Sequence, residues 1–312
     1  MTAVVPVARR RGTRAAERST DRAARPGALW VVPAALFFMV FAGLPLVLVA
    51  VLSFTSWNGL GTPAFNGLDN WSRMLSDSSV LDSLRISAIL TVLCWAVQTP
   101  LALLLGVWAA GRQRNRAALS SIFFLPLLMS TAAIAITWLT LLDPNFGLAA
   151  KIGPYIGFPD GNIIGSPRGA LGCIVVVVAW QFVPFHTLLY QAAARQIPQS
   201  LYDAATVDGA GRVRQFRHIT VPQLRNTIIT SSILMLVGSL TYFETVLILT
   251  AGGPGSATNI LPQHMYMSAF RDYQMGYASV IALSLVALGT ALSLVIVRFS
   301  GFAKMRSTLE GM

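Results

Sequence analysis

Six long apolar runs constrain this 312-residue chain more than any other feature. A bilayer hydrocarbon core is about 30 Å thick, so a helix that spans it needs roughly 20 consecutive apolar residues. The segments between the runs are too polar to lie in lipid, where every backbone polar group must be satisfied internally. The runs are Leu29–Phe54, Ile86–Ala110, Leu119–Leu142, Leu171–Tyr190, Thr227–Leu249 and Ala278–Val297. The sequence therefore predicts an all-α membrane protein with six transmembrane helices.

Basic residues are concentrated in alternate segments around these runs. Eighteen of the 23 Lys and Arg residues precede the first run or follow the second, fourth and sixth, and five lie in the other loops. Loops rich in Lys and Arg stay in the cytoplasm, so both termini are expected there. The expected parts are a basic cytoplasmic arm, residues 1–28, a membrane domain, residues 29–300, and a short cytoplasmic tail, residues 301–312. The charge of +11 thus reflects topology, and no basic face with stacking aromatics indicates nucleic-acid binding.

The residues that enzymes and metal sites use are few and scattered. The two cysteines, Cys94 and Cys173, both lie inside apolar runs and lack the spacing of a metal site or a disulfide framework. A phosphate-binding loop ends in Gly-Lys-Ser/Thr, whereas the two lysines, Lys151 and Lys304, each follow alanine. Of the three separated histidines, His186 in the fourth run is expected to be a packing residue rather than a pore residue. We therefore expect no enzymatic activity, and no metal or cofactor bound by this chain.

A patterned polar segment, residues 202–222, separates the fourth and fifth runs with the sequence YDAATVDGAGRVRQFRHITVP. It predicts two short helical pieces that meet at Gly209, since the missing Cβ permits a sharp change of direction. Ser200 and Asp203 have the spacing of a capping box, which predicts the start of the first piece. Pro222 is expected to end the second piece. So many patterned polar residues favour a surface that docks a partner, and the alternative is an amphipathic helix pair lying on lipid.

The spacing within this segment resembles the EAA loop in the permease subunits of binding-protein-dependent ABC importers. That loop has an acid and two alanines, then three residues, a glycine, nine residues, an isoleucine, one residue, a hydrophobe and a proline. The matching residues are Asp203, Ala204, Ala205, Gly209, Ile219, Val221 and Pro222. Asp203 replaces the usual Glu and Val221 the usual Leu, which preserves charge and apolar character. We call residues 195–224 the EAA-like segment.

Further stretches resemble the carbohydrate-uptake branch of these importers, the maltose and glycerol-3-phosphate permease type. They are IPQSLYDAATVDGAG at residues 197–211, FNGLDNW at 65–71, LTAGGP at 249–254, and Trp180 with Pro184 and Phe185. The resemblance covers about residues 29 to 300, and the spacing of the EAA-like segment is its most specific part.

The resemblance implies a type I ABC importer permease fold in a bacterial cell membrane. It also implies that the EAA-like segment docks into a cleft on a cytoplasmic ATPase, which would bind the ATP and Mg²⁺. The implied partners are a second, non-identical permease subunit, two ATPase subunits and an extracytoplasmic solute-binding protein. The implied solute is a mono- or oligosaccharide, or glycerol-3-phosphate. From the residues themselves we add Val213 and Phe216, three positions apart, as apolar contacts to the ATPase.

Polar and aromatic residues inside the runs are candidates for contact with a solute, because they are costly in lipid. The candidates are Tyr242, Phe243 and Glu244 in the fifth run and Trp180 and Gln181 in the fourth. Glu244 is the only acidic residue within any run. Its alternative role is a carboxylate near the membrane boundary that bonds to a helix end or to a partner subunit.

Three other functions stay open at this stage. An importer permease for another solute class would have the same segment, because that segment does not contact the solute. An ion-coupled secondary transporter would need charged relays and paired interrupted spans. A membrane-embedded enzyme would need a convergent set of nucleophile, acid and base, and the sequence offers none.

Overall fold

The computed structural model describes residues 28–111 and 116–300. Nearly all of the expected basic arm, and the expected C-terminal tail, lie outside the described residues. The chain forms two compact units, residues 1–48 and 49–312. The first unit contains a 3-10 turn, Ala28–Val31, then α1, Val32–Phe38, a π-helical segment, Met39–Gly43, and the start of α2, Leu44–Leu52. The 21-residue helical stretch Val32–Leu52 is apolar enough to cross a membrane.

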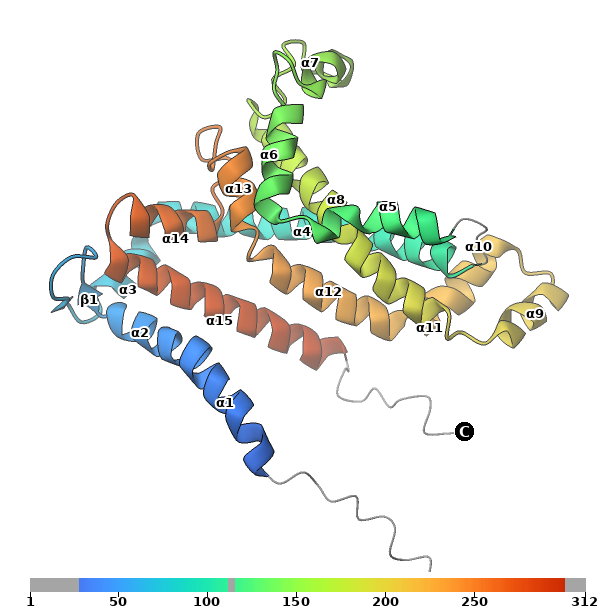
Figure 1. Cartoon of the computed structure of the whole chain (residues 1–312), viewed down its shortest axis with the longest axis horizontal. Coiled ribbons are helices and arrows are strands. Elements are labelled where there is room, and N and C mark those ends of the chain that lie inside the picture. The colour runs from blue at the N-terminus through green and yellow to red at the C-terminus, as the bar shows by residue number, and fades with distance from the viewer. Residues whose placement is uncertain (1–27, 112–115, 301–312) are drawn as a thin grey trace, which may run out of the picture. The chain divides into compact units, whose positions relative to one another are not determined.

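Three long helices run through the second unit (Figure 1). They are α4, Ser78–Ala110, α8, Pro167–Ala194, and α15, Met275–Ser300. Each contains a stretch long and apolar enough to span a membrane, as expected for the second, fourth and sixth runs. α4 starts before the predicted Ile86, because Asp77 caps its N-terminus. The backbone N–H of Ser79 donates to Oδ1 of Asp77 at 2.9 Å.

The third predicted span is wrong as a single helix. It consists of α5, Arg116–Leu128, and α6, Thr131–Leu141, whose axes differ by 112°. The hydroxyl of Ser130 accepts a hydrogen bond from the backbone N–H of Ala133 at 3.2 Å, so it caps a new helix. Pro126 precedes the break and removes one backbone donor near the end of α5.

The fifth predicted span is also broken. It consists of α12, Arg225–Ser239, and α13, Phe243–Leu249, which differ in direction by 50°. The hydroxyl of Thr241, in the turn between them, donates to the carbonyl of Gly238 at 2.7 Å. Among the described residues four helices are long enough to span alone, and there are six spans if each bent pair crosses once.

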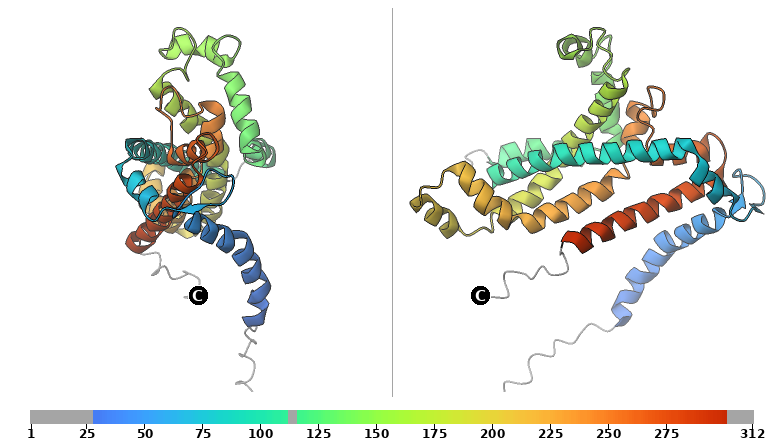
Figure 2. Two further views of the ribbon diagram at one scale, coloured as in Figure 1. Left: turned by 90° about the vertical axis from the view of Figure 1, so that its left-hand side faces the viewer. Right: turned by 180° about the vertical axis from the view of Figure 1, so that it is seen from behind.

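α4 and α8 pack closely along each other, as Figures 1 and 2 show. A Cβ added at Gly106 of α4 would lie 2.6 Å from the Cβ of Tyr190 in α8, so the contact requires glycine. Nearby, Nε2 of Gln191 donates to the carbonyl of Ala109 at 2.8 Å. His186 is buried and its Nδ1 lies 2.9 Å from the hydroxyl of Ser231, which fits the packing role expected for it.

Shorter elements lie at the two ends of the second unit. A two-stranded antiparallel hairpin and α3 lie at the end where α4 begins, and α9 to α11 lie where α4 ends (Figures 1 and 2). The amide of Asn70 fixes the hairpin by donating to the carbonyls of Ser53 and Thr55, at 3.1 and 2.9 Å. The remaining elements are β1, Thr55–Ser56, β2, Ala64–Phe65, α3, Asp69–Ser76, α7, Leu148–Ile152, a 3-10 turn, Gly153–Ile156, and α14, Leu261–Phe270.

Candidate functional site

The EAA-like segment folds into two helical pieces on either side of Gly209. The first is α9, Gln199–Val207, and the second joins α10, Arg212–Gln215, a π-helical stretch, Phe216–Thr220, and α11, Val221–Gln223. Gly209 has φ +75°, and its N–H donates to Thr206 O at 3.0 Å while that of Ala210 donates to Ala205 O at 2.8 Å. This is a Schellman C-cap, which favours glycine. A Cβ at Gly209 would meet no atom within 4 Å, so backbone conformation alone selects the residue.

The capping box predicted at Ser200 and Asp203 is wrong. α9 starts earlier, at Gln199, its N-cap residue is Pro198, and no side chain caps its first turn. The carboxylate of Asp203 instead accepts a hydrogen bond from Nε2 of Gln199 at 3.1 Å, one turn along the helix. Asp203 therefore braces the first turn of α9 from the second turn and does not start the helix.

The prediction that Pro222 ends the second piece is also wrong. The helical conformation continues through Pro222 and is interrupted at Leu224, after which α12 begins. Before the proline, the N–H of Val221 bonds to the carbonyl of Phe216 in a π turn. Proline has no N–H to donate, and the π turn has already shifted the backbone bonds of the preceding turn by one residue, so the helix accommodates Pro222 without ending.

Side-chain hydrogen bonds hold the two pieces in one arrangement. The hydroxyls of Tyr202 and Thr220 lie 2.9 Å apart. Nε2 of Gln215 donates to the hydroxyl of Thr206 at 3.0 Å and to the carbonyl of Ala210 at 2.9 Å. The segment is thus pre-formed, and a partner that binds it need not order it first.

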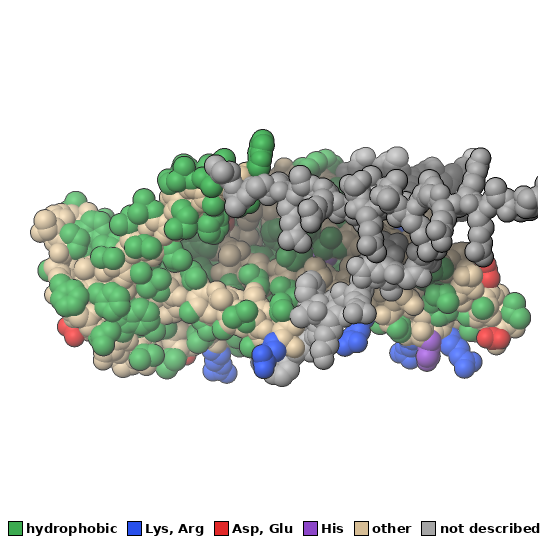
Figure 3. Space-filling view, turned by 90° about the horizontal axis from the view of Figure 1, so that it is seen from below, with side chains coloured by type: hydrophobic (Ala, Val, Ile, Leu, Met, Phe, Trp, Pro, Cys, Tyr) green, Lys and Arg blue, Asp and Glu red, His purple; other side chains and the backbone are tan. Residues whose placement is uncertain are grey.

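The outward surface of the segment is small, apolar and basic. Five of the predicted docking residues are exposed and three are half-buried; they are Asp203, Ala204, Gly209, Val213 and Pro222, and then Ala205, Phe216 and Ile219. Val213 exposes 71% of its surface. Beside it, the side chains of Arg212, Arg214 and Arg217 are exposed, and within the described ranges no ion pair or hydrogen bond engages them. Figure 3 shows Lys and Arg side chains projecting at this end, with acidic ones at its tip.

The two candidate solute contacts in α8 point in different directions. Trp180 is 41% exposed and meets Trp138 edge to face, with ring centroids 5.8 Å apart. Gln181 is buried, and its Nε2 donates to the hydroxyl of Thr131 at 3.1 Å. Gln181 therefore holds the start of α6, while Trp180 keeps a free aromatic face.

The three candidates at the start of α13 are not gathered into one site. Tyr242 is buried and stacks on Phe182 with ring centroids 5.7 Å apart. Phe243 is half-buried against Tyr266, at 4.9 Å between centroids. Glu244 is exposed, and its carboxylate has no hydrogen-bond or ion-pair partner in the part of the chain that the structure describes.

The two helix breaks, which the sequence did not predict, contact neighbouring residues of α8. Gln181 bonds to Thr131 directly after the break between α5 and α6. Phe182 stacks on Tyr242 directly before α13, at the break after α12. Interrupted spans frequently line solute paths in transporters, because their freed backbone groups require polar or protein surroundings. Ser130 was a sequence signal for the first break, and the pair Gly238-Ser239, which ends α12, was one for the second.

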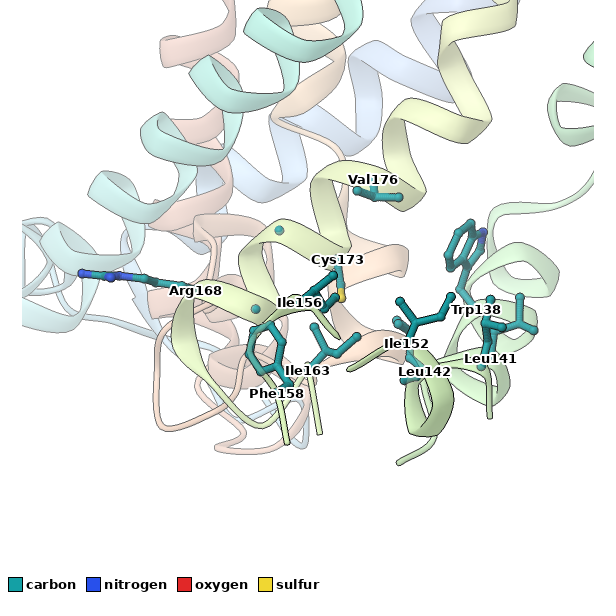
Figure 4. Close-up of a pocket in the computed structure, with 14 residues that line it drawn as sticks. Trp138, Leu141, Leu142, Ile152, Ile156, Phe158, Ile163, Arg168, Cys173 and Val176 are labelled. Carbon is teal, nitrogen blue, oxygen red and sulfur yellow. The ribbon is translucent and has the colours of Figure 1, made fainter. Parts of the chain in front are cut away.

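An apolar cavity of about 550 Å³ lies between α6, α7 and α8. Figure 4 shows Trp138, Ile152 and Cys173 around it, and shows the side chain of Arg168 directed away. Its lining offers almost no hydrogen-bonding groups. The hydroxyls around a sugar ring require such groups, so this cavity is not a sugar site.

The arrangement of the EAA-like segment can be compared with known proteins. Residues 102–302 match the family described as the inner membrane component of binding-protein-dependent transport systems. The match includes the whole segment and more than half of the chain. The chain belongs to this family. It is a membrane permease subunit of an ABC importer, as the sequence indicated, and a transport subunit rather than an enzyme.

Relatives extend the match over most of the permease. The probable ABC transporter permease protein YurN of Bacillus subtilis is 32% identical over 276 residues, covering 87% of this chain and 94% of that protein. The trehalose/maltose transport system permease protein MalF of Thermococcus litoralis is 31% identical, covering 88% and 93%. A bacterial ABC transporter that imports alginate has a similar chain, with TM-score 0.75 and 20% identity over 87% of this chain and 93% of that one. This last likeness shows the fold alone.

Proposed function

We propose that the permease carries a sugar or a related solute and that its EAA-like segment docks on a cytoplasmic ATPase that drives the transport. The observation that carries the docking is the pre-formed pair of helices, whose outward face holds exposed Ala204, Val213 and Pro222. The sugar is supported by the carbohydrate-branch sequence stretches and by the trehalose/maltose relative. The remaining partners are a second permease subunit and an extracytoplasmic binding protein. Both termini lie in the cytoplasm of a bacterial cell.

The segment has a direct mechanical connection to the membrane helices. It follows α8 within a few residues, and α12 begins one residue after the buried Leu224. A rigid displacement of the segment by the ATPase pair would therefore move α8 and α12 together. α12 ends at the break beside Tyr242, and Tyr242 stacks on Phe182 of α8. The displacement of the segment would thereby reach both helix breaks, the one between α5 and α6 and the one between α12 and α13, as a rigid-body rearrangement requires.

The five candidate residues for the solute path have two proposed roles, contact with the solute and support of the helix breaks. Trp180, Phe243 and Glu244 have exposed surface and would contact the solute through an aromatic face or a carboxylate. The buried Gln181 and Tyr242 would hold the breaks in position. An ABC importer permease for another solute class is the remaining alternative, and an ion-coupled transporter is less supported, since Glu244 alone makes no relay.

The docking is tested by Ala204→Trp. Ala204 is exposed on α9, so the indole fits the isolated permease, but it would separate the segment from the ATPase. We expect the ATPase subunits to be lost on co-purification and solute-stimulated ATP hydrolysis to disappear in vesicles. Ala204→Ser, which adds one atom, should retain both. If Ala204→Trp retains both as well, the segment does not dock the ATPase.

The sugar is tested independently. Calorimetry of the cognate binding protein against a panel of mono- and oligosaccharides should show binding of one member. Binding of an amino acid or an inorganic ion instead would refute the sugar while leaving the ATPase docking intact.

A further inference from the structure

A second feature of the EAA-like segment lies on its inner side. A cavity of about 670 Å³ is bounded by the ends of α4 and α8 and by α9 and α10. This region lies at the right-hand end of the molecule in Figure 1. The five exposed docking residues, from Asp203 to Pro222, are absent from its described lining, whereas the half-buried Phe216 belongs to it, and Arg212 lines both the cavity and an outer hollow. The cavity therefore lies mainly behind the surface that would meet the ATPase.

One wall of the cavity is apolar and continuous with the outer surface of α4. Leu104 and Trp108 line the cavity and are 55% and 54% exposed. Together with Leu101, 46% exposed, they form a stripe at positions i, i+3 and i+7, on one face of the helix. Such a stripe on a membrane-spanning helix is complementary to acyl chains, and tryptophan is typical of the headgroup boundary. The cavity thus continues onto an apolar face of α4 that an acyl chain fits.

The opposite wall is basic and rich in hydroxyl and amide groups. Arg195 and Arg212 line it, and no carboxylate is found among its described lining residues. The hydroxyls of Tyr202, Thr206 and Thr220 lie on the same wall. Arginine recognises phosphate oxygens with paired N–H donors. The hydroxyl of Thr206 donates to the carbonyl of Tyr202, whereas the hydrogen-bonded pair of Tyr202 and Thr220 keeps one O–H that can donate to a ligand. The wall is therefore complementary to a phosphate group.

The two walls together match one class of molecule. A free phosphate would use the arginines but leave the apolar stripe unused. An acyl chain without a charged headgroup would leave the arginines unpaired. We propose that the cavity binds the phosphate headgroup of an anionic phospholipid from the cytoplasmic leaflet, with an acyl chain along Leu101, Leu104 and Trp108. This rests on the proposed cytoplasmic position of the EAA-like segment.

The lipid contacts the groups that hold the segment together. Tyr202 and Thr220 are hydrogen-bonded to each other, as are Gln215 and Thr206, and all four line the cavity. A bound headgroup therefore bridges both helical pieces to the end of α4. It stabilises the arrangement in which the segment meets the ATPase, so the lipid composition of the membrane regulates coupling.

The proposal is tested on the purified importer, exchanged into micelles with equal amounts of phosphatidylglycerol and phosphatidylcholine. Native mass spectrometry then measures which lipid is retained. The unaltered protein should retain phosphatidylglycerol preferentially. Arg195→Gln and Arg212→Gln should each reduce the preference about five-fold, which is the effect of one basic side chain at an anionic surface. The matched control is the double variant of Arg214→Gln and Arg217→Gln, two exposed arginines that line a neighbouring hollow and not the cavity.

Three results would overturn the proposal. Equal retention of the two lipids by the unaltered protein does so without any variant, so misfolding of a variant leaves the test intact. An equal loss in either single variant and in the Arg214/Arg217 double variant would indicate a general effect of positive charge. Displacement of phosphatidylglycerol by millimolar inorganic phosphate would identify a site for a soluble phosphate. Retention of the ATPase by Ala204→Trp, with phosphatidylglycerol still preferred, would refute only the docking proposed above.

Discussion

The hydroxyl of Tyr277 donates a 2.6 Å hydrogen bond to Oδ2 of Asp77 and so joins the start of α15 to the start of α4. The guanidinium carbon of Arg73, in α3, lies 4.1 Å above the centre of the Tyr277 ring. Burial acts to raise the pKa of Asp77, but hydrogen bonds from Tyr277 and Ser79 outweigh it and lower the pKa. The carboxylate is therefore charged at neutral pH and ties three helices at the end opposite the EAA-like segment.

Replacing Tyr277 with Phe should lower stability while leaving the ATPase docked. The ring and its contact with Arg73 remain, but the hydrogen bond to Asp77 is lost. A hydrogen bond to a charged group contributes about 1.5 to 3 kcal/mol, and because Asp77 is only half-buried the effect lies at the lower end. The thermal unfolding midpoint in detergent should fall by a few degrees. Tyr273→Phe, at an exposed tyrosine nearby, should leave the midpoint unchanged.

Mild acid should destabilise the same end of the permease through His264. Burial lowers the pKa of His264 below its ordinary value of 6.5, although the charges of Asp77 and Asp272 oppose this. As pH falls through 6.5 the unfolded chain binds a proton that the folded chain resists, so stability decreases toward lower pH. Unfolding midpoints measured from pH 8 to 5.5 should decline, and His264→Gln should reduce the slope. If the midpoint of His264→Gln declines with pH as steeply as that of the unaltered protein, another group causes the pH dependence. His218→Gln serves as the control.

Helix contact between α4 and α8 should depend on Gly106. A Cβ there would lie 2.6 Å from Tyr190 Cβ and 2.9 Å from the carbonyl of Thr187, and backbone cannot yield locally. Gly106→Ala should therefore destabilise by about 1 to 3 kcal/mol, as overpacking does. Gly172→Ala in α8, where a Cβ meets nothing within 4 Å, should be neutral or slightly stabilising because alanine favours helix. Equal unfolding midpoints for the two variants would contradict this packing.

The helices that the sequence predicted correctly are those in which apolar length alone decides. The second, fourth and sixth runs each form one helix, and Pro100 and Pro184 lie inside two of them without ending them. Apolar length does not indicate whether a run is continuous, so both bent spans were missed. The first break has a local cause, the cap at Ser130. The second coincides with the contact between Tyr242 and Phe182, and such tertiary contacts cannot be read from one segment.

In the candidate site, too, features with a local cause could be predicted and features that depend on tertiary contacts could not. The turn at Gly209 followed from local chemistry, because a single residue type satisfies it. The capping box failed because α9 already begins at Gln199, after its N-cap residue Pro198, so Ser200 lies inside the first turn. The directions of Trp180, Gln181 and Tyr242 depend on which helices surround α8 and α13, and no spacing rule contains that information. The roles of these residues in docking and transport stay predictions.

Gly209 provides a test that separates backbone conformation from docking. At φ +75° an alanine is strained by about 1 kcal/mol, whereas asparagine tolerates the left-handed region better. Because a Cβ meets no atom within 4 Å, neither variant creates a clash within the permease. Gly209→Ala should therefore loosen the turn, seen as faster proteolysis between α9 and α10, and Gly209→Asn should do so less. If both variants resist proteolysis like the unaltered protein but lose the ATPase, the glycine is needed for contact rather than for the turn.

Glu244 should affect transport without affecting stability. Its carboxylate is exposed on the first turn of α13, and an unpaired charge cannot face lipid at that position without a large cost. Glu244→Gln keeps the shape and the hydrogen-bonding capacity while removing the charge. We expect uptake by reconstituted vesicles to fall several-fold with the unfolding midpoint unchanged, since no described group pairs with the carboxylate. Thr241→Ser, one turn before Glu244 and exposed in the break, is the matched control. Unchanged uptake in Glu244→Gln would remove this residue from the solute path, and a lowered midpoint would instead indicate a bond to a partner subunit.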